Sequence, residues 1–168
     1  MTDILTIKNG RKVVNNGMNE EKVLLDEINL TIREGDFITV LGGNGAGKST
    51  LFNTIAGTLQ LSQGSISFKD QLITKDSEEK RARFLSRVFQ DPKMGTAPRM
   101  TVAENLLLAQ KRGQKRKFRL RNLKNQKEDF FRLCQEVGNG LEQHLDTPAG
   151  ELSGGQRQAL SLLMATIT

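Results

Sequence analysis

The sequence predicts an α/β fold with an antiparallel β flank and a helical insert. Ile4 to Lys8 is a short strand-like run, and Ile28, Leu30 and Ile32 alternate with polar residues, as in a half-buried antiparallel strand. The continuous apolar run from Phe37 to Leu41 is typical of a strand buried on both faces, and it runs directly into a glycine-rich loop. Helical patterns dominate the rest of the chain, which gives a mixed α/β class.

Two more short strands are expected, each beside a turn. Gln63-Gly64 is a turn signal before the alternating run Ser65 to Phe68. Arg87 to Gln90 is expected as a strand that ends at Asp91-Pro92, because the residue before proline is restricted.

The expected helices begin at recognisable capping residues or glycines. Lys48 to Thr58 follows the glycine loop, and Asp76 with Glu79 is a candidate cap pair. Thr101 with Glu104 forms a capping box that opens a helix through about Lys111. A second helix of the insert is expected from about 123 to 137, with its core face at Leu123, Phe130, Cys134 and Val137. A last helix starts near Gly154.

Composition and charge limit the function classes. The single cysteine, Cys134, excludes an internal disulfide and is expected as a packed thiol, and no apolar run approaches the roughly 20 residues that a membrane span needs. We therefore expect a cytoplasmic protein whose membrane role comes through a partner. The net charge of +6 is concentrated between Lys111 and Lys127, where a solvated face is favoured over an anionic lipid or acidic partner. Nucleic-acid binding is disfavoured because the chain lacks Trp and Tyr.

The glycine-rich loop fits the phosphate-binding pattern G-x-x-x-x-G-K-[ST]. Its residues are Gly42, Gly43, Asn44, Gly45, Ala46, Gly47, Lys48, Ser49 and Thr50. Glycines let main-chain N–H groups converge on phosphate oxygens, and the following helix points its positive end at the anion. Lys48 would reach the β- and γ-phosphates of a nucleotide, the Ser49 hydroxyl would ligate Mg²⁺, and Thr50 would support the α-phosphate side.

A second Gly-rich turn opens the last helix, at Leu152-Ser153-Gly154-Gly155-Gln156. A serine hydroxyl and two glycine N–H groups at a helix N-terminus make a second anion site. One chain has no evident need of two sites for the same phosphate.

Together these two stretches resemble the Walker A loop and the signature motif of ATP-binding cassette (ABC) ATPases, whose core is a RecA-like P-loop NTPase fold. Val88 to Pro92 resembles the family's Q-loop, Met100 to Leu106 the helix after it, and Ile32 to Phe37 the turn before Walker A. The resemblance covers nearly the whole chain. The sequence most resembles ATP-binding subunits of a bacterial importer group of the tryptophan/tyrosine type.

The resemblance implies roles for particular residues. Lys48 and Gln90 would act in catalysis, with Gln90 contacting Mg²⁺ and the attacking water. Ser153, Gly154, Gly155 and Gln156 would close over ATP held by the Walker A loop of another subunit in a head-to-tail dimer. Val14 would pack against adenine where the family has an aromatic residue, so a stacking contribution of about 1 kcal/mol would be lost.

The resemblance also implies organisation and partners. The chain would be one partial ABC ATPase domain, 1–168, with a nucleotide-binding core and β flank at 1–91, a helical subdomain at 92–150 and the signature helix at 151–168. Its partners would be membrane permease subunits, a second ATP-binding subunit and, indirectly, a substrate-binding protein. It would lie on the inner face of the cell membrane.

No Walker B strand, following glutamate, D-loop or switch histidine is found in the 168 residues, and His144 precedes the signature. We therefore expect a truncated or incomplete subunit that is poorly stable alone and hydrolyses ATP weakly, since positioning dominates phosphoryl transfer. Two alternatives stay open: a non-hydrolytic nucleotide-binding module, and a soluble ABC ATPase that does not serve transport.

Overall fold

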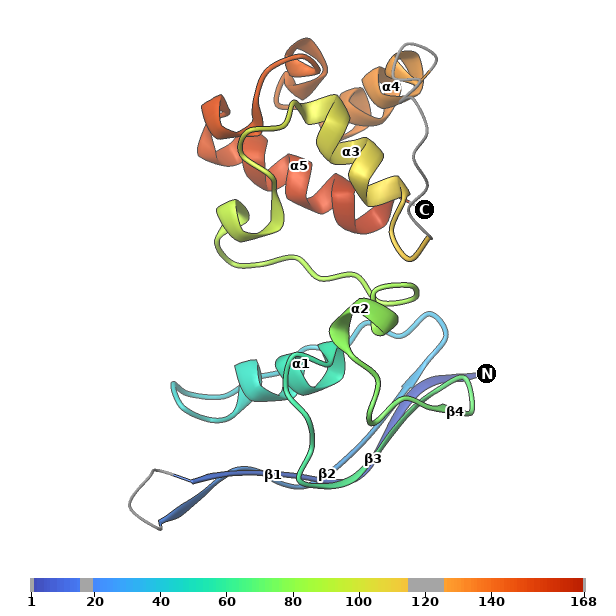
Figure 1. Ribbon diagram of the computed structural model, residues 1–168, viewed down its shortest axis with the longest axis vertical. Helices are drawn as coiled ribbons and strands as arrows, with labels where there is room; N and C mark the ends of the chain where they lie inside the picture. Colours follow the sequence, from blue (N-terminus) through green and yellow to red (C-terminus); the bar gives the residue numbers. More distant parts are fainter. Residues whose placement is uncertain (1, 16–19, 115–125, 168) are drawn as a thin grey trace. The chain divides into compact units, whose positions relative to one another are not determined.

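The computed structural model describes residues 2–15, 20–114 and 126–167, and the chain divides into two compact units, Met1–Ala82 and Arg83–Thr168 (Figure 1). The first unit contains β1 (Asp3–Asn15), β2 (Glu21–Arg33), α1 (Lys48–Ala56), β3 (Gln63–Phe68), β4 (Gln71–Leu72) and α2 (Glu78–Arg81). The second contains η1 (Pro92–Gly95), α3 (Val102–Gln110), α4 (Lys127–Val137), η2 (Leu141–His144), η3 (Ala149–Glu151) and α5 (Gly154–Thr166), where η marks a 3₁₀ helix. The predicted division at residues 91 and 150 stays a prediction.

The sheet of the first unit is antiparallel throughout, in the order β2-β1-β3-β4. Three strands confirm the runs expected at 4–8, 28–32 and 65–68, although β1 and β2 extend well beyond them. Leu5 and Ile7 on β1 and Ile66 on β3 are buried on the face that the alternation predicts.

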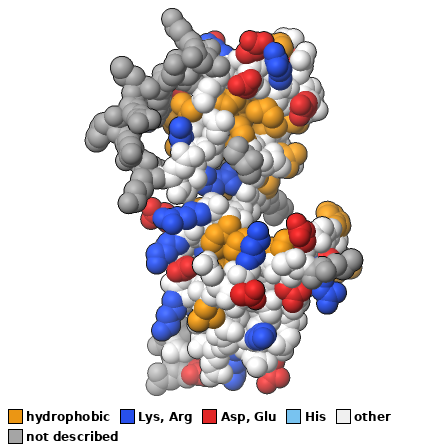
Figure 2. Space-filling view, turned by 90° about the vertical axis from the view of Figure 1, so that its right-hand side faces the viewer, with side chains coloured by type: hydrophobic (Ala, Val, Ile, Leu, Met, Phe, Trp, Pro, Cys, Tyr) orange, Lys and Arg blue, Asp and Glu red, His pale blue; other side chains and the backbone are white. Residues whose placement is uncertain are grey.

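Two expected strands are wrong. Phe37 to Leu41 and Arg87 to Gln90 both lie in irregular backbone. Phe37 is 95% exposed and Leu41 is 87% exposed, so both apolar side chains lie at the surface of the first unit. Figure 2 shows that apolar side chains reach the molecular surface. A strand forms only when its N–H and C=O groups pair with a neighbouring strand, and within the described sheet neither segment pairs.

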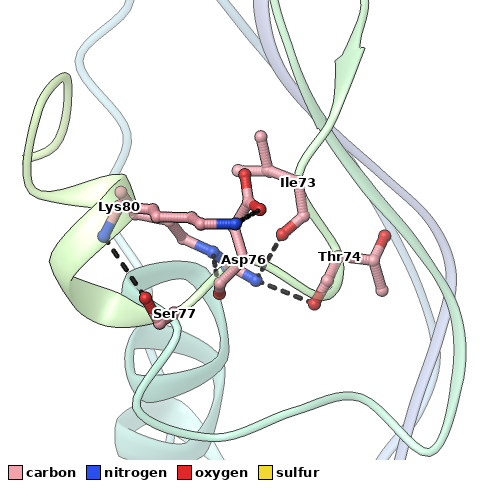
Figure 3. Close-up of polar contacts among 6 residues, drawn as sticks. Ile73, Thr74, Asp76, Ser77 and Lys80 are labelled. Carbon is pink, nitrogen blue, oxygen red and sulfur yellow. Dashed lines mark hydrogen bonds and ion pairs between the residues drawn. The ribbon is translucent and has the colours of Figure 1, made fainter.

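The buried guanidinium of Arg81 joins α1 to the turn after β4 by hydrogen bonds. It is 1% exposed and donates five hydrogen bonds, all to main-chain carbonyls. Two go to the last turn of α1, at Thr54 (2.7 Å) and Ile55 (2.8 Å). The others go to Ile73 (2.7 Å), Thr74 (2.9 Å) and Asp76 (3.1 Å), whose carbonyls are drawn in Figure 3.

This arrangement suits a buried cation. Burial lowers the pKa of the Arg81 guanidinium, and the nearby charge of Asp76 partly opposes that shift. All five donors of the guanidinium have acceptors, so the charge is not left unsatisfied. A cation beside the last carbonyls of α1 is also favoured by the helix dipole.

The short helix α2 begins one residue later than the sequence indicates. Its N-cap is Ser77, whose Oγ accepts a hydrogen bond from Lys80 N at 3.4 Å (Figure 3). The Asp76 carboxylate instead pairs with the ammonium of Lys80 at 3.4 Å. Either residue can cap a helix, and here the carboxylate is used for an ion pair.

The second unit is built on a core shared by α3, α4 and α5. The buried residues of this cluster are Val102, Ala103, Leu106, Leu107, Phe130, Cys134, Leu141, Leu145, Ala149, Leu152, Ala159, Leu160 and Leu163. The predicted core positions Phe130 and Cys134 of α4 are confirmed, Val137 is partly buried, and Leu123 lies outside the described residues. The capping box of Thr101 and Glu104 is also confirmed, with both reciprocal hydrogen bonds present.

Replacing Arg81 by Met should lower the free energy of unfolding by about 3 kcal/mol or more, because buried carbonyls lose their donor. Denaturant unfolding of the two proteins measures this. Lys80→Met on the same helix is the matched control, since its exposed ion pair contributes little. Equal unfolding midpoints for the two variants would contradict the role assigned to Arg81.

Cys134 should resist modification in the folded protein. Burial, and to a lesser extent the charge of Glu142, raises the pKa of its thiol to about 11. A disulfide reagent at pH 8 should therefore react slowly with the folded protein and fast after unfolding. Fast reaction in the native state would contradict the packing of Cys134.

The same pKa shift predicts a pH dependence of stability. The free energy of unfolding should fall as the pH rises from the ordinary thiol pKa of 9.0 toward about 11, because over this range the unfolded chain loses the thiol proton and the folded chain keeps it.

Candidate functional site

The loop from Gly42 to Gly47 leads directly into α1 and is exposed or half-buried along its length. Gly45 and Gly47 adopt left-handed backbone with φ of 82° and 83°, and Gly47 is the N-cap of α1. The first N–H groups of a helix have no partner within it, so those at Lys48 to Thr50 are directed out of the N-terminus of α1. The structure thus brings the predicted residues Gly42, Gly43, Asn44, Gly45, Ala46, Gly47, Lys48, Ser49 and Thr50 together at one helix end.

Gly47 is required for two independent reasons. Its left-handed conformation disfavours any side chain. A Cβ at this position would also lie 2.7 Å from the main-chain oxygen of Leu24 on β2. The close approach fixes the start of α1 against the sheet.

Lys48 folds back over the loop. Its ammonium donates to the carbonyl oxygens of Gly42 at 2.6 Å and Gly43 at 2.7 Å. A positive charge is therefore held at the loop whose N–H groups already favour an anion.

The N-terminus of α5 forms the second candidate site. Ser153 is its N-cap, with a capping box in which Ser153 Oγ accepts from Gln156 N (3.3 Å) and Gln156 Oε1 accepts from Ser153 N (3.2 Å). The Ser153 hydroxyl proton remains available to an outside acceptor, because a hydroxyl both donates and accepts. The structure brings Ser153, Gly154, Gly155 and Gln156 together in one exposed turn.

Gly154 and Gly155 have a different reason to be glycine. Neither has positive φ, and a Cβ at either would meet no atom within 4 Å. The fold of this unit therefore does not exclude a side chain at these positions. Open space beside two exposed N–H groups suits a group that approaches from outside.

The side-chain amide of Asn105, which the sequence did not single out, fixes the segment that precedes α3 in the chain. Asn105 is fully buried; its Oδ1 accepts from Ala97 N at 2.8 Å. Its Nδ2 donates to the carbonyls of Ala97, Met100 and Thr101 at 2.9 to 3.1 Å. The same stretch contacts the segment before α5, because Gly150 N donates to Pro98 O and Ala149 N donates to Met100 O, both at 2.9 Å.

Arg157 was also missed, and it lies directly behind the second site. It donates to three main-chain carbonyls in the segment that precedes Ser153. Arg81, Asn105 and Arg157 share no periodic pattern. The one available signal was the presence of an arginine in the first turns of a predicted helix, where its charge opposes the dipole.

The other two predicted site residues, Gln90 and Val14, belong to neither of these two turns. Gln90 is exposed and lies in the second unit, directly before Asp91, whose carboxylate caps η1 by accepting from Lys93 N at 2.9 Å. Val14 is half-buried on β1, opposite Lys22. It adjoins a polar pocket but does not line it; the lining residues are Arg11, Val13, Asn15, Glu21, Ser62 and Gln63. The roles assigned to Gln90 and Val14 stay predictions.

Among the described residues, no group of three or more His, Cys, Asp or Glu side chains is placed to hold a metal ion. Over the same residues, every helix is too short or too polar to cross a membrane.

Comparison with known proteins gives three concordant results. A family described as ABC transporter matches residues 25–168. The tyrosine transport ATP-binding protein of Clostridioides difficile is 39% identical over 164 residues, which are 98% of this chain and 65% of that protein. The sn-glycerol-3-phosphate import ATP-binding protein of Bartonella bacilliformis is 33% identical over 141 residues, 83% of this chain and 37% of that protein.

A solved structure supports the fold. The dimeric ATP-binding cassette MJ0796, in a post-hydrolysis state bound to ADP and Pi, superposes with a TM-score of 0.77 at 24% identity, over 98% of this chain and 69% of that one. The expected P-loop NTPase fold with an antiparallel flank and a helical subdomain is therefore confirmed. The chain spans 65% and 37% of the length of the two curated relatives.

Gly47→Ala should lower the free energy of unfolding by about 1–2 kcal/mol from the left-handed conformation alone, and further because of the contact with Leu24. Thermal unfolding without nucleotide measures the loss. Gly43→Ala is the matched control, because a Cβ there meets nothing within 4 Å and its φ is not positive. A Gly47→Ala protein as stable as Gly43→Ala would show that the start of α1 is not fixed by this approach.

Proposed function

The chain belongs to the ABC transporter family, and on that premise we propose that it is the ATP-binding subunit of an importer, which binds Mg·ATP and couples its hydrolysis to transport. The observation that carries the proposal is that one chain has two helix starts of different construction, each suited to an anion. One is the loop that holds the Lys48 ammonium at the start of α1. The other is the capped turn at the start of α5.

In this proposal ATP binds with its phosphates at the N-terminus of α1. Lys48 leaves the carbonyls of Gly42 and Gly43 for the β- and γ-phosphates, since a full negative charge is a better partner than a carbonyl dipole. The N–H groups of residues 43 to 50 surround the phosphates, and Thr50 supports the α-phosphate. Val14 packs against the base.

Magnesium accompanies the nucleotide in this proposal. The Ser49 hydroxyl would be a protein ligand, because Mg²⁺ prefers oxygen donors. When bound, Mg²⁺ would neutralise charge that develops on the phosphates. Ser49 is exposed on the first turn of α1, which leaves its hydroxyl accessible from solvent.

The second site acts on the ATP of another subunit. Ser153, Gly154 and Gly155 present a hydroxyl and two N–H groups with no side chain in front of them, which suits the γ-phosphate of a facing nucleotide. Two subunits in head-to-tail arrangement would thus close over two ATP molecules. The MJ0796 cassette is dimeric in its post-hydrolysis state with ADP and Pi, which supports this arrangement.

Transport itself belongs to partners. We propose that permease subunits anchor the dimer at the inner face of the cell membrane and that a substrate-binding protein delivers cargo to them. The two curated relatives are named for tyrosine and for sn-glycerol-3-phosphate, which differ in charge and shape. The proposal therefore places cargo recognition on the partners of this chain.

Lys48→Ala should abolish detectable Mg·ATP binding, because it removes the ammonium that donates to the loop carbonyls. Titration with a fluorescent ATP analogue measures the affinity. Lys75→Ala, an exposed lysine of the same unit, is the control for charge and should bind like the wild type. Unchanged affinity in Lys48→Ala would overturn the assignment of the site.

A further inference from the structure

Arg157 occupies an electrostatically unfavourable position for which the fold offers a local explanation. It is the fourth residue of α5, in the first turns, where the helix dipole disfavours a cation. Its Nε donates to Ala149 O at 2.9 Å, and one terminal nitrogen donates to Gly150 O at 2.7 Å and Leu152 O at 3.3 Å. The guanidinium therefore binds the segment that leads into Ser153.

The segment is held from two sides. On one side, main-chain hydrogen bonds join Ala149 N to Met100 O and Gly150 N to Pro98 O. On the other side, the carbonyls of Ala149, Gly150 and Leu152 accept from Arg157. The position of Ser153, one residue after Leu152, is thereby fixed relative to the helix that it caps.

The same contacts change the charge at the site. Three carbonyl oxygens gathered beside the start of α5 would repel an approaching phosphate. The guanidinium of Arg157 donates hydrogen bonds to these oxygens, so their partial negative charge is offset beside the turn. Lys at this position would keep the charge but lose the planar fork that reaches three acceptors at once.

We propose that Arg157 is a positioning residue for the anion site of α5: by holding the carbonyls of Ala149, Gly150 and Leu152, it fixes the orientation in which Ser153, Gly154 and Gly155 meet the nucleotide of the facing subunit. The inference rests on the proposed function, since it needs a nucleotide at this turn. It assigns Arg157 no contact with the nucleotide itself.

The test compares Arg157→Lys and Arg157→Gln with the wild type in the protein as its gene encodes it. Binding of a fluorescent ATP analogue is measured at protein concentrations low enough to keep subunits apart. Dimerisation is measured by sedimentation with Mg²⁺ and a non-hydrolysable ATP analogue. Arg132→Gln is the control: it removes a cation of the same unit from an exposed ion pair with Glu128.

We expect both variants to bind the fluorescent analogue like the wild type and to dimerise about tenfold or more weakly, equivalent to about 1.4 kcal/mol. Arg132→Gln should match the wild type in both measurements. Arg157→Lys should resemble Arg157→Gln, because both variants lose the planar fork that reaches three carbonyl oxygens.

Four results would overturn the inference. If Arg157→Lys dimerised as tightly as the wild type, the positive charge alone would matter. If both variants dimerised normally, Arg157 would have no role in positioning the turn. An equal loss of analogue binding and dimerisation would indicate a general effect on folding. A wild-type protein that binds the analogue but stays monomeric would overturn the proposed dimer, and the inference with it.

Discussion

The structure depends on leaving main-chain N–H groups unpaired at two helix starts while the backbone around them is held in place. Those N–H groups cannot both hold the loop and bind an anion. Cationic side chains instead hold the backbone near these helices through its carbonyls. Arg81 holds the last turn of α1, and Arg157 holds the segment before α5, whereas in the proposed function Lys48 donates to Gly42 and Gly43 only until a phosphate replaces them.

The two helices are fixed in different ways, and their glycines reflect this. α1 is fixed at both ends: Gly47 lies against the backbone of β2, and Gly57 leaves room for the side chain of Arg81 at its other end. A Cβ on either glycine would meet neighbouring atoms of the same unit. At α5, a Cβ on Gly154 or Gly155 would meet no atom within 4 Å, so the described unit itself does not require glycine there. The proposed function supplies a reason for these glycines, because the nucleotide of a facing subunit would approach this turn.

The motifs and the capping box at Thr101 could be predicted from the sequence because each is a local pattern with its own chemistry. The box at Ser153 has the same spacing but was not predicted. The cap of α2 was predicted at Asp76 and lies at Ser77, since either residue can cap a helix. Phe37 to Leu41 could not be predicted in the same way, because a strand depends on a neighbour that its own residues do not specify. Arg81, Asn105 and Arg157 were missed since they bind carbonyls through contacts that no spacing encodes, some of them up to 27 residues away in the sequence.

The central claim, that the α5 turn of one subunit completes the phosphate loop of another, is tested most directly by mixing two defective variants. Lys48→Ala disables the phosphate loop, and Gly154→Asp places a carboxylate in the open space of the signature turn while favouring the helix start. Each alone should fail to trap ATP. If the sites are shared between subunits, the mixture contains dimers with one intact composite site and should recover part of the trapped nucleotide. If the mixture traps no more ATP than its components, the two sites do not act on one nucleotide between subunits, and the account is contradicted.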